Sequence, residues 1–294
     1  MSATILKLAE QRAPVEESRD WTLEWQRFKH RVQLTRKWWL RPHVAFQPYF
    51  VIATTRSGSN LLLSYLKQQP EVSALSEVLC PKLAIGPSEH CLPPAKAIKH
   101  LRYSLQGARG AARGAKLMMH QMANCQLTMD GLYEAFPQAK FIILYRQSMG
   151  EQFVSQETSM ATGQFLVYAG EHRREARVRI DAAKLRSYCE GMRNGYREAI
   201  SRPWLRGRAV LLSYEELTAE PDYWMGQHIW PLLGVTPVPA ETQLVKQNTQ
   251  PLSQLVTNYA QVAALLHSPL CQQYHAWPWQ RNHSLQKQTR RRAA

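Results

Sequence analysis

The fold is decided by residues 49–67, which read YFVIA (49–53), TTRSGS (54–59) and NLLLSYLK (60–67). The first segment is a short β-branched and aromatic run, typical of a strand that is buried on both faces. The second is a polar turn, and the third has the leucine spacing of a helix that ends before Pro70. A strand, a turn and a helix in this order predict the beginning of a parallel α/β sheet.

Further strand patterns lie at residues 72–75, 114–119, 140–145 and 208–213, and helical patterns at 150–160 and 171–200 separate them. Strands that alternate with helices pair in parallel through right-handed crossovers. The sequence therefore predicts one α/β catalytic domain, a three-layer parallel sheet flanked by helices. It spans residues 48–274, between a basic helical N-terminal extension (1–47) and a basic C-terminal tail (275–294).

The chain of 294 residues has 37 basic and 22 acidic side chains, and its formal net charge of +15 favours acidic partners. One stretch without acidic residues contains GARGAARGAK (107–116), a candidate anion-facing loop. Nucleic acid is the first partner that such a charge suggests. The sequence has no zinc-finger spacing, RNP-like motif or helix-turn-helix pattern, so we expect no specific nucleic-acid binding. A non-catalytic basic module that binds nucleic acid or anionic lipid remains an alternative.

Hydropathy and cysteine content indicate the cell compartment. No apolar run approaches the roughly 18 residues of a membrane helix, and residues 1–20 lack the apolar core of a secretory signal. The five cysteines are an odd number without a CxxC pair, which argues against a disulfide scaffold or zinc site and favours a cytoplasmic location. Residues 21–40 mix Trp and Leu with Lys and Arg. They predict either a helix docked on the core or peripheral contact with an anionic membrane. The oligomeric state is not readable from the sequence.

The turn TTRSGS has the composition of an anion-binding loop. Because it precedes a helix, it aims free amide groups and a partial positive charge at an anion. Ser57, Gly58 and Ser59 are small enough for the backbone to approach a phosphate, while Arg56 adds a charged fork. The side chains of Ser59 and Asn60 can donate hydrogen bonds. An ordinary turn with a serine N-cap is the alternative.

The loop differs from that of NTP-hydrolysing enzymes. It lacks the GxxxxGK[ST] pattern, and the strand at 140–145 ends in Arg146 instead of a magnesium-binding Asp. A cation at this point predicts a phosphate that is held directly, without a metal. Ser155 lies nine residues further on and could grip the same phosphate. A surface ion pair for Arg146 and a packing role for Ser155 are the alternatives.

Four segments, in order, resemble the sulfotransferases that use 3′-phosphoadenosine 5′-phosphosulfate (PAPS). TTRSGSNLLLSYL is similar to their 5′-phosphosulfate loop, YRQSMGEQFVS to their 3′-phosphate motif, and LLSYEELTAEPDYW to their SYEDL segment. LVKQNTQPLSQLVTNYAQVAALL resembles the ending of the bacterial carbohydrate branch, which includes trehalose 2-sulfotransferase and the nodulation-factor sulfotransferase. The resemblance covers residues 49–266.

The resemblance implies a P-loop-type fold related to nucleotide kinases, PAPS as the sulfuryl donor, no metal, and a hydroxyl of a carbohydrate or glycolipid as the acceptor. A phenol, alcohol or lipid acceptor is the alternative. It also implies the residues that hold the donor. They are Arg56, Ser57, Gly58, Ser59 and Asn60 for the 5′-phosphosulfate, Arg146 and Ser155 for the 3′-phosphate, and Lys246 and Gln247 near the nucleotide. Asn60 departs from the Thr that is often found at the loop's end.

Two candidates for the general base lie where strands end, at the edge where open α/β sheets bind ligands. The carbohydrate branch has a catalytic Glu at the position of Glu77, and the aryl and steroid branch has a catalytic His near His120. We expect Glu77 to be the base and His120 to support the acceptor or the leaving group, while Arg56 neutralises charge on the leaving oxygen. The alternatives are a helix-capping Glu77 and a core His120. Residues 79–113 and 156–179 are expected to form the acceptor pocket.

Overall fold

The computed structural model describes residues 45–83, 86–87 and 91–276, together with the isolated residues 22, 25, 26, 29 and 32. The interpretation of residues 21–40 as a docking or membrane helix therefore lies almost entirely outside the described residues. The basic tail beyond residue 276 lies outside them as well.

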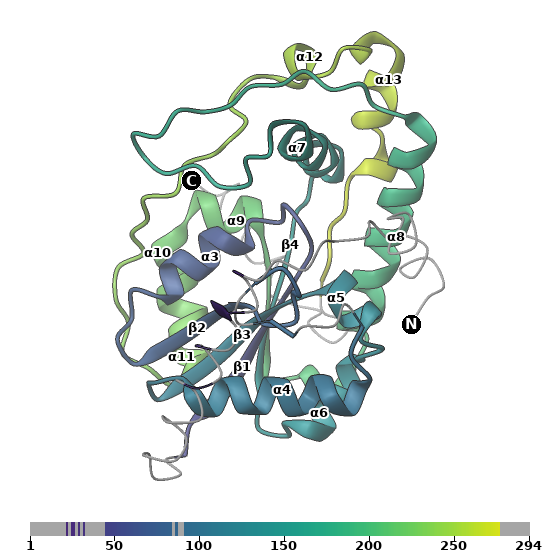
Figure 1. The fold of residues 1–294 in the computed structure, drawn as a ribbon. Coiled ribbons are helices and arrows are strands. Elements are labelled where there is room, and N and C mark those ends of the chain that lie inside the picture. The colour runs from purple at the N-terminus through teal and green to yellow at the C-terminus, as the bar shows by residue number, and fades with distance from the viewer. Residues whose placement is uncertain are drawn as a thin grey trace, which may run out of the picture.

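Five parallel strands form one sheet in the order β2–β3–β1–β4–β5 (Figure 1). The strands are β1 (Gln47–Ala53), β2 (Val72–Glu77), β3 (Ala112–Met118), β4 (Lys140–Tyr145) and β5 (Ala209–Ser213). In the register, Val51 of β1 lies between Lys116 of β3 and Ile142 of β4. The prediction of a parallel α/β sheet flanked by helices is confirmed.

Helices cover both faces of the sheet, and successive residues of each strand pack against opposite layers. Phe50 and Ile52 belong to the core beneath one layer, and Tyr49 and Val51 to the core beneath the other. The first layer contains α4 (Pro94–Gly107), α5 (Met119–Asn124), α6 (Met129–Ala135) and the end of α8 (Ala182–Ile200). The second contains α3 (Ser59–Leu66), α9 (Tyr214–Ala219), α10 (Pro221–Trp224), the π-helical turn Met225–Ile229 and α11 (Trp230–Leu233).

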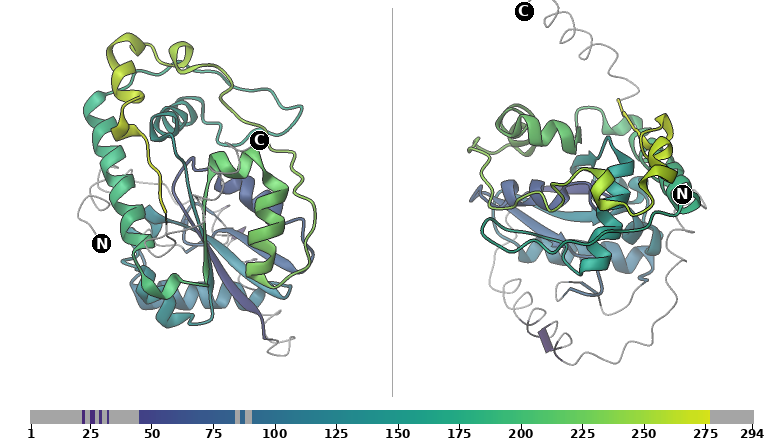
Figure 2. Two further views of the ribbon diagram at one scale, coloured as in Figure 1. Left: turned by 180° about the vertical axis from the view of Figure 1, so that it is seen from behind. Right: turned by 90° about the horizontal axis from the view of Figure 1, so that it is seen from above.

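A third cluster of buried residues lies beyond the carboxyl ends of the strands. It joins α7 (Met149–Thr162) and the start of α8 to α12 (Leu252–Leu255), α13 (Tyr259–Leu266) and the short helix Pro269–Cys271. Two segments, residues 163–181 and 242–258, run beside each other across this end of the molecule (Figures 1 and 2). Antiparallel pairing of Tyr168 with Leu244 and parallel pairing of Val178 with Val256 connect them. We refer to this pair of segments as the double rim.

Two sequence interpretations need correction. The predicted helix at 171–200 begins only at Ala182, because the Asp181 carboxylate accepts hydrogen bonds from the amides of Ala183 and Lys184 and thereby caps it. GARGAARGAK is not a single anion-facing loop, because half of it, residues 112–116, belongs to the interior strand β3. The Arg113 side chain in that stretch donates to the carbonyls of Gly110 and Gln106. In the described part of the chain, no helix is both long and apolar enough to cross a membrane.

Candidate functional site

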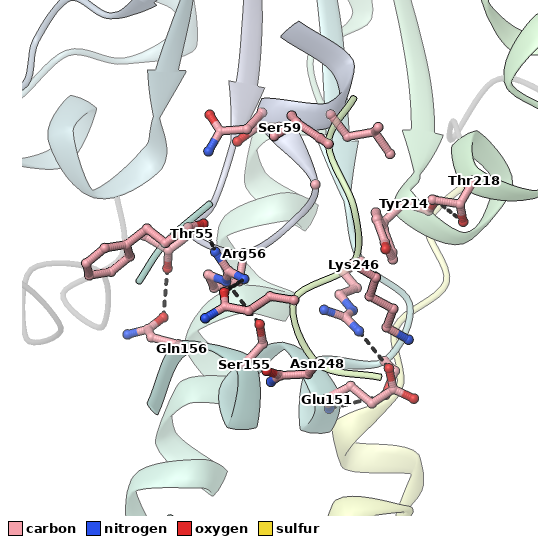
Figure 3. A pocket seen from close by; sticks show the side chains of 18 of the residues that line it. Thr55, Arg56, Ser59, Glu151, Ser155, Gln156, Tyr214, Thr218, Lys246 and Asn248 are labelled. Atoms are coloured by element: carbon pink, nitrogen blue, oxygen red, sulfur yellow. Dashed lines mark hydrogen bonds and ion pairs between the residues drawn. The ribbon is translucent and has the colours of Figure 1, made fainter. Parts of the chain in front are cut away.

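A cavity of about 1170 Å³ opens at the carboxyl edge of the sheet (Figure 3). Its walls come from the turn after β1, the ends of β2 and β3, helices α7 and α9, and the double rim. It brings together most of the residues singled out from the sequence: Arg56, Gly58, Ser59, Asn60, Glu77, Arg146, Ser155, Lys246 and Gln247. Segments that are distant in the sequence thus line one cavity.

The N-terminus of α3 faces this cavity with its amides free. No protein group among the described residues accepts from the amides of Ser59 and Asn60, and no acidic residue occupies the first turn. Gly58 precedes the helix with φ of 86°, and a Cβ there would lie 2.3 Å from Cδ2 of Tyr214. Both the left-handed conformation and the close ring require glycine. Ser57 lies in the same turn but is fully buried, and its hydroxyl donates to the Thr54 carbonyl at 2.8 Å.

The Arg56 side chain crosses from the turn to α7 and the double rim. Its Nε donates to Ser155 Oγ at 3.0 Å, and its Nη2 donates to Gln247 Oε1 at 2.7 Å (Figure 3). Its Nη1 donates to the Phe165 carbonyl at 2.6 Å. The structure therefore brings Arg56 next to Ser155, the residue that the resemblance links to the 3′-phosphate. The sequence alone does not show that the Arg56 side chain points toward Ser155.

Arg146 follows β4 and is held by acidic and aromatic side chains. Its Nη2 donates to Glu151 Oε2 at 2.6 Å, its Nε lies 3.8 Å from Glu215 Oε1, and its guanidinium stands 5.0 Å from the centre of the Tyr214 ring. The Nε is buried and makes no hydrogen bond. Burial, and then repulsion by Arg146, lower the pKa of Arg56. Two guanidinium groups that repel each other beside free amides form a site that an anion would stabilise.

The candidate base occupies a second cluster on the cavity wall. Glu77 ends β2 at an irregularity of the strand register, and its Oε1 lies 3.0 Å from Nζ of Lys116. Its Oε2 accepts from Nε2 of Gln121 at 2.7 Å, while Lys116 also donates to Oδ1 of Asn60 at 2.6 Å. Asn60 thus connects the first turn of α3 to the carboxylate through one ammonium group. None of the helices in the described part of the chain begins at Glu77.

Lys116 is the residue of this cluster that the sequence analysis missed. Its side chain is only 2% exposed, and it belongs to β3, which is paired with a strand on each side. The sequence signal for it was a single lysine within the apolar strand pattern GAKLMM. A lysine buried in such a strand needs a charge partner, which indicates an acidic residue nearby. His120, in contrast, lies on α5, half-buried, and does not line the cavity.

Of the two segments expected to form the acceptor pocket, only one contributes to this cavity. Residues of 156–167 line the cavity, whereas no described residue of 79–113 does. Among the described residues, no three or more His, Cys, Asp or Glu side chains lie close enough together to hold a metal ion.

Comparisons with known proteins add the following. A family model described as "Sulfotransferase family" matches residues 81–236, more than half of the 294 residues. A solved sulfotransferase from Alicyclobacillus acidocaldarius is 16% identical, with a TM-score of 0.45, over 80% of this chain and 99% of that one. The sulfotransferase domain from the curacin biosynthetic pathway is 14% identical, with a TM-score of 0.43, over 86% and 99% of the two chains. The mouse sulfotransferase SULT7A1 complexed with PAP is 12% identical, with a TM-score of 0.39, over 66% and 61%. Comparison with curated protein sequences gives no match.

Proposed function

Because this chain belongs to the sulfotransferase family, we propose that it transfers a sulfuryl group from PAPS to a hydroxyl of a carbohydrate or glycolipid. One observation carries the donor assignment. The guanidinium groups of Arg56 and Arg146 lie near each other on the cavity wall, and Ser155 and the free amides of α3 line the same cavity. A donor with phosphate groups at two positions matches a cavity that offers both paired guanidinium groups and the free amides of a helix N-terminus.

In the proposed complex, the first turn of α3 receives the 5′-phosphosulfate, and Arg146 with Ser155 receives the 3′-phosphate. Arg56 lies beside Ser155 and can exchange its bond to the Phe165 carbonyl for a phosphate oxygen. The Lys246 ammonium also lines the cavity and adds positive charge. All of these contacts come from the protein, and the proposed route needs no metal.

The chemical step is an in-line displacement. The acceptor oxygen forms a bond to sulfur while the bond from sulfur to the phosphate oxygen breaks, and the released nucleotide keeps that electron pair. Glu77 takes the hydroxyl proton, and the amides of Ser59 and Asn60 stabilise the charge that develops on the leaving oxygen. Lys116 holds the carboxylate in place with its 3.0 Å contact. His120 remains a prediction as a supporting residue outside the cavity wall.

Thermal stabilisation by PAP and by AMP in EDTA tests the donor assignment. A ligand that binds the folded state raises the melting temperature according to its affinity. We expect PAP to stabilise the protein more than AMP does, with only weak dependence on salt. Equal stabilisation by both nucleotides, with a steep loss in salt, would indicate a general polyanion binder instead. A radiolabelled PAPS assay over sugars, glycolipids, phenols and alcohols then identifies the acceptor class.

A further inference from the structure

Half of the exposed large apolar side chains in the described part of the chain lie on one short segment beside the cavity. Large apolar side chains are exposed at eight described positions, and four of these lie between residues 160 and 168. They are Met160 (54% exposed), Phe165 (54%), Leu166 (39%) and Tyr168 (44%). We call these four residues the apolar lip. Such a concentration on one short segment marks an interaction site more often than scattered surface residues do.

The apolar lip is continuous with the catalytic cavity. Met160, Phe165 and Leu166 line the same cavity as Glu77. Leu244 and Val245 of the other segment of the double rim line it as well. Residues 158–170 contain no charged side chain. An apolar surface therefore extends from the cavity to the solvent.

The backbone of the apolar lip is held in place, so the exposure of its side chains does not arise from a loose loop. The Phe165 carbonyl accepts from Arg56 at 2.6 Å, and the Gln164 carbonyl accepts from Gln247 Nε2 at 2.7 Å. The Val245 amide donates to the Val167 carbonyl at 3.0 Å. The residues that hold the anion site thus also fix the apolar lip.

The size of the cavity leaves room for a second molecule beside the donor. Its volume of about 1170 Å³ exceeds the range of about 300–1,000 Å³ that is usual for one small ligand. Because the charged groups gather on the side of Arg56 and Arg146, the uncharged apolar lip is the part of the wall that a nucleotide does not need.

We propose that the acceptor is amphipathic: its hydroxyl reaches Glu77 while an alkyl or aromatic portion lies on Met160, Phe165 and Leu166. This inference rests on the proposed function and narrows its acceptor class to molecules with an apolar group next to the hydroxyl-bearing part. A free sugar lacks the portion that would cover the apolar lip.

The test uses n-alkyl β-D-glucosides from methyl to octyl, each below its critical micelle concentration, with the full-length protein saturated with PAP. Each methylene buried on the apolar lip should raise affinity about twofold to fourfold. The double variant Phe165→Ser, Leu166→Ser should reduce this increment to less than 1.5-fold while PAP affinity stays unchanged. Tyr223→Ser is the matched control, because it alters an exposed aromatic residue that does not line the cavity. It should leave the gain in affinity per methylene unchanged.

The outcomes separate the two proposals. Normal PAP binding with no dependence on chain length would overturn the amphipathic acceptor and leave the sulfotransferase assignment intact. Failure to bind PAP would instead contradict the proposed function. An equal effect of the double variant on methyl and octyl glucosides would mean that the side chains contact the sugar, which also overturns the inference. In a further arm, binding to phosphatidylcholine vesicles in preference to dissolved octyl glucoside would show docking on a lipid surface and overturn it as well.

Discussion

Glu77→Gln separates a catalytic carboxylate from a structural one. The substitution keeps the size of the side chain but removes the charge that faces Lys116 at 3.0 Å, and it leaves one acceptor oxygen where Lys116 and Gln121 now use two. Lys116 keeps its contact to Asn60 at 2.6 Å, so the ammonium is not left without an acceptor. We therefore expect kcat to fall by about 10²-fold or more, the usual contribution of a general base, while PAP affinity stays within twofold.

The same contacts set the expected loss of stability. A hydrogen bond to a charged group contributes about 1.5–3 kcal/mol. The Glu77 side chain is 27% exposed, so solvent screening reduces the contribution of its contacts to stability. We expect the free energy of unfolding to fall by about 1–2 kcal/mol, which is a few degrees in Tm for a chain of this size.

The assay combines single-turnover sulfuryl transfer from radiolabelled PAPS with calorimetric titration of PAP and a thermal melt. Glu71→Gln is the matched control, because Glu71 directly precedes β2 at the opposite end of the strand and is exposed. A kcat within threefold of the unaltered protein would refute the role of Glu77 as the base. A parallel loss of turnover and PAP affinity would refute it too, since it would indicate a collapsed site.

Three further substitutions test the 3′-phosphate assignment, the turn before α3 and the pH dependence of stability. Arg146→Ala should weaken PAP about 10- to 100-fold in calorimetric titration but AMP less than threefold, because charge-assisted bonds to the 3′-phosphate are lost; equal losses would contradict the assignment. Gly58→Ala should cost about 1–3 kcal/mol in urea unfolding, since it combines a φ of 86° with a contact of 2.3 Å. Gly207→Ala, at a φ of 69° with open space around it, should cost only about 1 kcal/mol. Burial and the charges of nearby arginines lower the pKa of His275 to about 4. The folded state thus binds this proton less readily than the unfolded state, and stability that is complete above about pH 6.5 is lost as the pH falls toward 4. His275→Gln should therefore reduce the loss of unfolding free energy between pH 7 and pH 5 by about 1–2 kcal/mol, and an unchanged pH profile would rule out this cause.

The sheet could be predicted because local patterns determine it. The strands at residues 140–145 and 208–213 are apolar on both faces, which is the requirement of a parallel sheet between two helical layers. The turn before α3 was equally readable, since Gly58 and its small neighbours precede an apolar helix pattern.

The hydrogen bonds and ion pairs of the site could not be predicted, since they join segments that are distant in the sequence. Arg56 was assigned to the 5′-phosphosulfate, and no sequence pattern indicated the contact between its side chain and Ser155 of α7. Lys116 was counted only as part of a basic stretch, because one strand does not reveal its partner on the next. The start of α8 was misplaced because Asp181, as a cap, outweighs the helical spacing of the residues before it.

The connections of the two arginines have a consequence for how the protein acquires activity during synthesis. Arg56 contacts Gln247, which is 191 residues away, and the Arg146 carbonyl accepts from Gln273, which is 127 residues away. Contacts of this separation form late, after most of the chain is available. A nascent chain on the ribosome could build its first strands early and still lack these contacts until residue 273 has emerged.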